Sequence, residues 1–182
     1  MKINVIDLDH TLIPYDSFKK YILYFMFSDI LRFVKFSFWT LLNYLGIFKK
    51  ETFYTKIIMC SRKDAKYKKK MIQHAEEAIN KFNVNVLEIV KSNTDNDTIN
   101  ILCSASPADY VSIIAKKLSW QYLSSYFDDS SKFIYVKGFG KISELERIYP
   151  KNKYYYNFSI SDNPEDLDLL KKFNTYILYK GY

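Results

Sequence analysis

The most constraining feature of this sequence is a short apolar segment near its beginning that runs directly into two carboxylates. Residues 3–6 (Ile-Asn-Val-Ile) have the composition of a buried strand, and Asp7-Leu8-Asp9-His10-Thr11 follows at once. In open α/β sheets, ligands bind beyond the carboxyl ends of the parallel strands. The pattern therefore predicts that residues 7–11 form part of a site at such a sheet edge.

The remaining fold is predicted from a change of pattern along the chain. Apolar residues in 16–95 recur at helical spacing, which predicts helices at 18–25, 30–45 and 51–59, and one long helix or a broken pair at 63–90. After residue 97, predicted strands at 99–103, 121–127, 132–136, 154–160 and 175–179 alternate with helices at 106–118, 141–148 and 164–171. Ser106 and Pro107 suit the N-cap and first turn of the helix that they open.

Alternating strands and helices are typical of a parallel sheet that is covered on both faces. We therefore predict an α/β fold: a Rossmann-like parallel-sheet core with helices on both faces, plus an inserted all-helical cap. Residues 1–15 and 96–182 would form the core and residues 16–95 the cap.

Polar side chains also follow other strand ends or open a helix. Ser104 and Ala105 follow the second strand, Lys141 opens a helix after a Gly-Phe-Gly turn, and residues 161–166 (Ser-Asp-Asn-Pro-Glu-Asp) follow the strand at 154–160. If Asp162 joined the two carboxylates of the first strand end, their like charges would require a compensating cation. Mg²⁺ suits a few carboxylates combined with waters and a substrate phosphate.

These groups together have the chemistry of phosphoryl transfer. A carboxylate such as Asp7 can act as a covalent nucleophile, and a carboxyl two residues later can protonate the leaving oxygen and then activate water. The Ser104 hydroxyl and nearby backbone N–H groups can hold phosphate oxygens, while Lys141 adds positive charge. An Asp-x-Asp pair alone is common at strand ends, but the four motifs in this order predict a Mg²⁺-dependent phosphatase that works through an aspartyl-phosphate.

At this point the sequence resembles the haloacid dehalogenase-like hydrolase superfamily. Residues 7–12 look like its first motif, residues 101–104 the second, Lys141 the third, and Asp162 with Asp166 the fourth. The segments Asp16-Ser17-Phe18 and 161–170 resemble its phosphoserine-phosphatase-like branch (subfamily IB), which carries a helical cap after the first strand.

The resemblance implies a role for each matching residue. Asp7 would be the nucleophile and a Mg²⁺ ligand, and Asp9 the general acid/base that also binds Mg²⁺ through its backbone carbonyl. Asp162 would be the third Mg²⁺ ligand, and Lys141 would neutralise the charge of nucleophile and phosphate. Phosphate binding and support of the site would fall to Ser104, Ala105, Thr11, Asn163 and Asp166, the last bracing Lys141 or a metal-bound water.

The sequence also departs from the family pattern. Ser161 stands where many relatives have glycine, and Asp168 replaces a frequent proline. In phosphoserine phosphatases a glutamate after the first motif holds the substrate amine, whereas here the shorter Asp16 lies in that neighbourhood. We expect Asp16 to take part in substrate selection, and its length argues against phosphoserine.

The predicted cap carries the whole net charge of the chain. Residues 16–95 contain 15 Lys or Arg against 8 Asp or Glu, which equals the net charge of +7, and they are rich in aromatic residues. Apolar, basic helices can lie on an anionic bilayer, and some relatives act on phosphatidylglycerophosphate. One hypothesis is that residues 18–59 contact a membrane or an amphiphilic substrate; the alternative is that the aromatic residues form the cap's own core and the lysines its solvated face.

The composition also restricts location and partners. The longest uncharged run, residues 36–48, is shorter than the roughly 20 residues of a membrane-spanning helix. Two cysteines, Cys60 and Cys103, are too few for a disulfide framework, so we expect a cytoplasmic protein, with membrane association left open. The expected partner is a phosphorylated small molecule or lipid, and the Lys-rich run at 66–70 is interpreted as a solvated face rather than a nucleic-acid site.

Single residues and rival functions complete the predictions. We expect His10 to complete the first loop, His74 to lie on a helix surface and Cys103 to pack within its strand. A phosphotransferase would use the same residues and intermediate, so the sequence does not separate it from a phosphatase. The third hypothesis is a non-catalytic phosphate-binding module, but the complete set of motifs argues against it.

Overall fold

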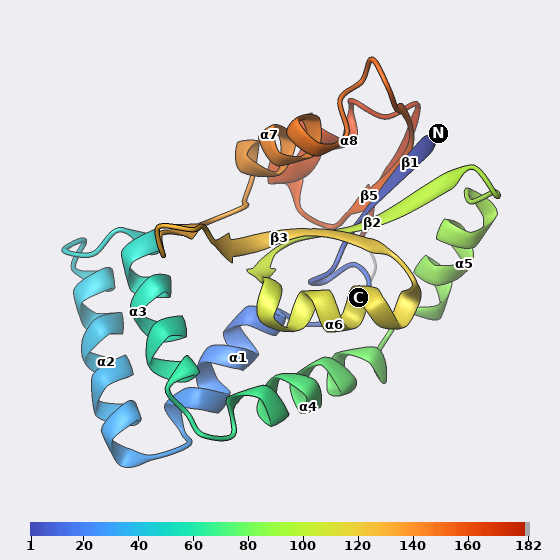
Figure 1. Ribbon diagram of the computed structural model, residues 1–182. Coiled ribbons are helices and arrows are strands. Elements are labelled where there is room, and N and C mark those ends of the chain that lie inside the picture. Colours follow the sequence, from blue (N-terminus) through green and yellow to red (C-terminus); the bar gives the residue numbers. More distant parts are fainter. Residues whose placement is uncertain (181–182) are drawn as a thin grey trace.

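The computed structural model describes residues 1–180 and contains a six-stranded sheet in the order β4-β3-β2-β1-β5-β6 (Figure 1). Five strands run parallel, and only the edge strand β4 is antiparallel to its neighbour β3. The strands are β1 (Lys2–Asp7), β2 (Thr98–Pro107), β3 (Gln121–Phe127), β4 (Phe133–Ile134), β5 (Tyr155–Ser161) and β6 (Thr175–Leu178). The predicted α/β class and parallel core are confirmed.

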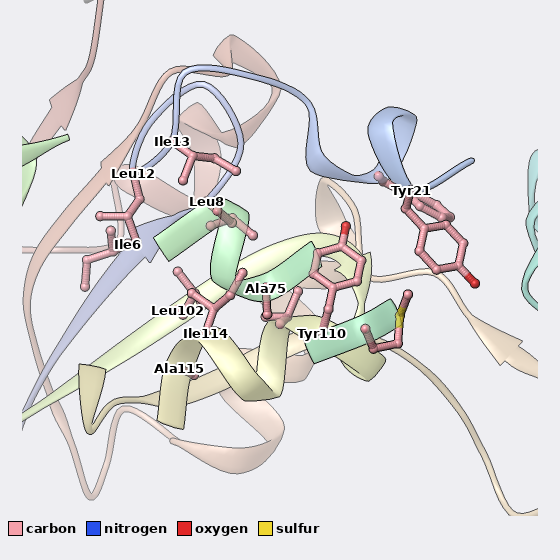
Figure 2. Close-up of a cluster of buried hydrophobic side chains, with 14 of the residues drawn as sticks. Ile6, Leu8, Leu12, Ile13, Tyr21, Ala75, Leu102, Tyr110, Ile114 and Ala115 are labelled. Atoms are coloured by element: carbon pink, nitrogen blue, oxygen red, sulfur yellow. The ribbon is translucent and has the colours of Figure 1, made fainter. Parts of the chain in front are cut away.

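Alternate residues of β1 feed two separate hydrophobic clusters, because successive side chains of a strand point to opposite faces. Ile3 and Val5 join a cluster with α7 (Phe139–Ile148) and α8 (Leu167–Leu170). Ile6 joins a larger cluster with α6 (Ala108–Leu118) on the other face. Figure 2 shows part of the larger cluster, where the loop after β1 packs close to β2 and α6 through Leu8, Leu12, Ile13, Leu102, Tyr110 and Ile114.

All the regular elements between β1 and β2 are helices, while the predicted division into a core and a cap at residues 15 and 95 stays a prediction. The helices are α1 (Ser17–Met26), α2 (Ile30–Tyr44), α3 (Lys50–Arg62), α4 (Tyr67–Ile79) and α5 (Val84–Ser92). α2 contacts α1 and α3, whereas α4 packs along α6 of the sheet layer. The predicted alternatives for residues 63–90 resolve to the broken pair, and the Asn83 side chain caps α5 by accepting from the backbone N–H groups of Asn85 and Val86.

Several local predictions are wrong. Ser106 does not cap a helix: α6 begins after Pro107 without a side-chain cap, because the Ser106 hydroxyl donates to Asp9 instead. The strand predicted at 132–136 is only two residues long and antiparallel. The helix predicted at 164–171 starts as a 3-10 turn, Pro164–Asp166, before α8. His74, expected at the surface, is buried beneath α1, where its Nε2 lies 3.1 Å from the Ser17 carbonyl oxygen.

The described residues contain neither a candidate membrane-spanning helix nor a candidate metal-binding cluster of side chains. Among residues 1–180, no helix combines the length and apolarity that a membrane crossing requires. The same residues contain no cluster of three or more His, Cys, Asp or Glu side chains that could hold a metal by itself.

Candidate active site

A buried lysine links two carboxylates at the carboxyl edge of the sheet. The Lys141 ammonium donates to Asp7 Oδ1 at 2.7 Å and to Asp166 Oδ2 at 2.6 Å, and all three residues are buried. Burial raises the pKa of Asp7 to about 7, although the nearby Lys141 ammonium lowers it. Burial disfavours the charged form of Lys141, but Asp7 and Asp166 outweigh this effect and hold its pKa above the usual range.

The local backbone explains how Lys141 reaches this position. Gly138 precedes α7 with a φ of +54°, a conformation that favours glycine, and its carbonyl accepts from the Lys141 backbone N–H. The second partner of Lys141, Asp166, is held in turn by Ser161, whose hydroxyl donates to Asp166 Oδ2 at 2.8 Å. Asp166 Oδ1 is buried without a hydrogen-bond partner, so the Asp166 carboxylate is oriented by Lys141 and Ser161 alone within residues 1–180.

Thr11 joins the first strand end to the fourth motif. Its hydroxyl accepts from the Asp162 backbone N–H at 2.8 Å and lies 3.4 Å from Asp7 Oδ2 and 3.3 Å from Asp162 Oδ1. His10, with a φ of +56°, turns the chain between Asp9 and Thr11, as expected of a residue that completes the loop. Thr11 itself is fully buried and is not part of the cavity wall described below.

The donor set at this point fits a hard cation. Asp7 and Asp162 each direct a carboxylate oxygen towards the same Thr11 hydroxyl, and both residues line the cavity. Two carboxylates alone do not complete the coordination shell of a metal ion. Mg²⁺, however, commonly binds one or two carboxylates together with other oxygen ligands such as a main-chain carbonyl, waters and a substrate phosphate. Asp7 and Asp162 are the side chains that could hold it. The Asp9 carbonyl as a further ligand stays a prediction from the family resemblance.

The Asp9 carboxyl group is held by the inserted helices and by β2. Its Oδ1 accepts from the Ser17 backbone N–H at 2.7 Å, at the start of α1, and its Oδ2 accepts from the Ser106 hydroxyl at 2.9 Å. Burial raises the pKa of Asp9, and the hydrogen bonds from Ser17 and Ser106 offset part of this rise. The acid is thus fixed in orientation beside Asp7 and faces the same cavity.

The second motif is arranged differently from the sequence prediction. The Ser104 side chain is buried, accepts from the Ser106 backbone N–H at 3.1 Å and lies 3.5 Å from Asp9 Oδ2. Ala105 and Ser106, rather than Ser104, line the cavity. Phosphate binding by Ser104 and Ala105 stays a prediction, and the structure adds Ser106 to the candidates.

A hydrogen-bonded network behind Asp9 was missed by the sequence analysis. The Ser17 hydroxyl lies 3.2 Å from the Ser106 hydroxyl and 2.9 Å from the Tyr110 hydroxyl, and His74 reaches the Ser17 carbonyl. These residues come from α1, α4, α6 and β2. No spacing rule connects them, so only the packing of the insertion on the core brings them together.

The candidate catalytic groups open into one cavity of about 990 Å³. Asp16 and Asn163 also line it. The Asp16 carboxylate accepts from the Lys19 backbone N–H at 2.7 Å as the N-cap of α1, and the Asn163 carboxamide accepts from the Glu165 backbone N–H at 3.0 Å. Substrate selection by Asp16 and the supporting role of Asn163 stay predictions, each now combined with a backbone-capping role.

Comparison with protein families gives one match over most of the chain. The model of the haloacid dehalogenase-like hydrolases matches residues 5–171, which include all the motifs described above. No curated protein matches the sequence significantly.

Solved structures share the fold at low sequence identity. A protein of unknown function from Bordetella pertussis Tohama I is 12% identical with a TM-score of 0.67, covering 98% of this chain and 99% of that one. A phosphoserine phosphohydrolase-like protein from Francisella tularensis SCHU S4 is 15% identical with a TM-score of 0.61, covering 99% and 88%. A phospho-aspartyl intermediate analogue of phosphoserine phosphatase is 16% identical with a TM-score of 0.52, covering 98% and 94%.

Proposed function

The chain belongs to the haloacid dehalogenase-like hydrolases, and we propose that it is a Mg²⁺-dependent phosphatase that hydrolyses a phosphate monoester through an aspartyl-phosphate on Asp7. The family match and the phosphatases among the similar structures support the enzyme class that the sequence predicts, a phosphoric monoester hydrolase. The fold that the chain shares with phosphoserine phosphatase structures supports the predicted resemblance to the phosphoserine-phosphatase-like branch.

The observation that carries this proposal is the arrangement of Asp7, Asp9 and Lys141 at one end of the cavity. Lys141 holds one oxygen of Asp7, which fixes the carboxylate and offsets its charge, while the other oxygen lies on the side of Thr11 and Asp162. The carboxyl group of Asp9 is held separately by Ser17 and Ser106. Two carboxyl groups with different partners can take different roles in one reaction.

In the first step, an Asp7 oxygen forms a bond to phosphorus as the ester P–O bond breaks, and the Asp9 carboxyl gives its proton to the leaving oxygen. In the second step, the Asp9 carboxylate takes a proton from water, the water oxygen bonds to phosphorus, and the bond to Asp7 breaks. Bound Mg²⁺, held by Asp7, Asp162 and the Asp9 carbonyl, would supply positive charge against the phosphate oxygens. Lys141 keeps the developing negative charge compensated throughout.

The test is release of inorganic phosphate from p-nitrophenyl phosphate with and without Mg²⁺. We expect turnover that EDTA removes and Mg²⁺ restores, and its loss in Asp7→Asn, which keeps the shape of the side chain but not the nucleophile. Asp168→Asn is the matched control, because Asp168 lies on α8 and does not line the cavity. Full activity of Asp7→Asn would refute the assignment of the nucleophile.

The substrate and location remain part of the proposal. The catalytic end of the cavity is compatible with both predicted substrate classes, a small phosphometabolite and a lipid phosphate such as phosphatidylglycerophosphate. For the location, we propose a cytoplasmic protein whose cap touches an anionic membrane. Support for membrane contact comes from α2, where Phe36 is the only buried residue and many apolar side chains are exposed, including Ile30, Leu31, Val34, Phe38, Leu41 and Tyr44. Co-sedimentation with anionic vesicles at low and high salt tests this contact, and absence of binding would refute it.

A further inference from the structure

The cavity continues from the catalytic carboxylates along the inserted helices. Phe18, Ile22 and Met26 line it from α1, and their spacing of four residues places them on one side of that helix. From Phe18 to Met26 the helix rises about 12 Å, so the cavity follows α1 for most of its length. Because the Ser17 N–H at the start of α1 holds Asp9, this apolar row begins beside the catalytic end.

The walls change from charged to apolar along the same cavity. Asp7, Asp9, Lys141 and Asp162 line the catalytic end. The part that we call the apolar arm is lined by α1, α2 and α3 through Phe18, Ile22, Leu23, Met26, Ser37, Thr40, Leu41, Tyr44, Phe53 and Tyr54. Lys19 in the first turn of α1 also lines the cavity, next to the catalytic end. Beyond that turn, the lining side chains of the arm present hydroxyl groups but no charge.

We propose that the apolar arm binds the hydrocarbon chain of the substrate, so that the enzyme prefers phosphate monoesters of long, single-chain alcohols over small polar phosphates. This inference rests on the proposed phosphatase function and adds the substrate class. A charged phosphate at the Asp7 end and a flexible apolar chain along α1 match the two halves of the cavity.

The size of the cavity supports this occupant. Its 990 Å³ lies at the upper end of the roughly 300–1,000 Å³ typical of small-molecule pockets. A small phosphorylated amino acid would fill only the catalytic end and leave the apolar arm in contact with water. Asp16 lines the cavity, but its carboxylate already accepts a backbone hydrogen bond from Lys19 as the N-cap of α1.

The arm is also open towards solvent along one side. Leu23, Leu41 and Tyr44 line it and are more than two-fifths exposed, whereas Phe18 and Phe53, which also line it, are buried. A chain longer than the arm can therefore leave it past the exposed apolar side chains. We expect affinity to rise with chain length and then level off, without a sharp upper limit.

The experiment compares ethyl, butyl, hexyl, octyl and decyl phosphate as substrates, with the matching alkylphosphonates as ligands in calorimetry. The phosphonates cannot be hydrolysed at their P–C bond, so their binding is measured independently of catalysis. Burial of methylene groups predicts that kcat/KM and affinity rise about two- to fourfold per methylene until they level off. Equal kcat/KM and equal affinity across the series would overturn the proposal.

Two substitutions test where the chain lies. Ile22→Asn places a polar group in the arm, and Ser37→Trp fills part of it. Each should reduce the ratio of decyl to ethyl affinity by at least about tenfold, since several methylene contacts are lost. Ile30→Asn is the matched control, because Ile30 is 74% exposed on α2 and does not line the cavity, and it should keep the wild-type ratio.

The outcomes separate the two proposals. If no alkyl phosphate or p-nitrophenyl phosphate is hydrolysed but phosphonate affinity rises with chain length, the phosphatase proposal fails and the chain-binding arm stands. If all esters are hydrolysed at equal rates and phosphonates bind equally, the phosphatase stands and the arm proposal fails. If chain-length preference survives in both folded arm variants, as judged by their unchanged melting transitions, the chain binds elsewhere and the assignment to the arm is refuted.

Discussion

His74 offers a pH-dependent test of how the insertion packs on the core. The residue is only 5% exposed, and burial lowers the pKa of its ring from 6.5 to about 4, although the Ser17 carbonyl favours the charged ring. Between these two values the unfolded chain binds a proton that the folded chain does not. The stability that neutral His74 contributes is therefore fully present above pH 6.5 and is lost as the pH falls through 4. At 1.36 kcal/mol per pKa unit, the loss is about 3 kcal/mol.

The assay is urea unfolding of the wild type and His74→Gln at intervals from pH 7 to pH 4. Carboxylates that titrate in the same range, including Asp7, are present in both proteins, so their effect largely cancels in the difference. We expect the free-energy difference between the two proteins to fall by about 3 kcal/mol towards pH 4. His10→Gln, at an exposed loop position, is the control for loss of a histidine side chain as such. A difference that stays constant with pH would refute the buried, neutral state of His74.

Three further predictions concern the site and its supports. Lys141→Met should lower the free energy of unfolding in urea by about 3–5 kcal/mol at neutral pH, because it leaves two buried carboxylates uncompensated; an unchanged midpoint would contradict the buried pairing. Asp16→Ala should cost about 1 kcal/mol through loss of the α1 cap, and Asp29→Ala, which removes the equivalent cap of α2, should cost about the same; no loss in either would show that these caps do not form. Gly138→Ala should lower the melting temperature, since its φ of +54° strains a side chain, and a wild-type melting curve would refute that backbone conformation.

The sequence predicted those parts of the structure that depend on local pattern. Strand-forming residues followed by Asp7, Ser104 or Asp162 mark the carboxyl ends of parallel strands, and parallel strands place such ends at one edge. Helical spacing likewise located the inserted helices α1 to α3. For residues 63–90 it left open one long helix or a broken pair, and the structure has the pair α4 and α5.

The parts that the sequence did not predict depend on contacts between distant segments. His74 belongs to a run of polar residues that resembles a solvated helix, yet α4 packs along α6 and buries its ring. Ser106 has the local signature of a helix cap, but its hydroxyl donates to the carboxyl group of Asp9, which follows another strand. The apolar arm is similar: α1 to α3 have the sequence of a small helical core, and only their arrangement leaves a cavity between them.

The central claim is that Asp7 carries the phosphoryl group during turnover. The most direct measurement is mass spectrometry of the protein after rapid acid quench during turnover of p-nitrophenyl phosphate, with borohydride reduction to mark the acyl phosphate. In Asp9→Asn, which lacks the group that activates water, the intermediate should accumulate. We expect one added phosphoryl group, with the reduced residue at position 7 and no label in Asp7→Asn. A label on another residue, or turnover without any phosphorylated protein in both the wild type and Asp9→Asn, would contradict it.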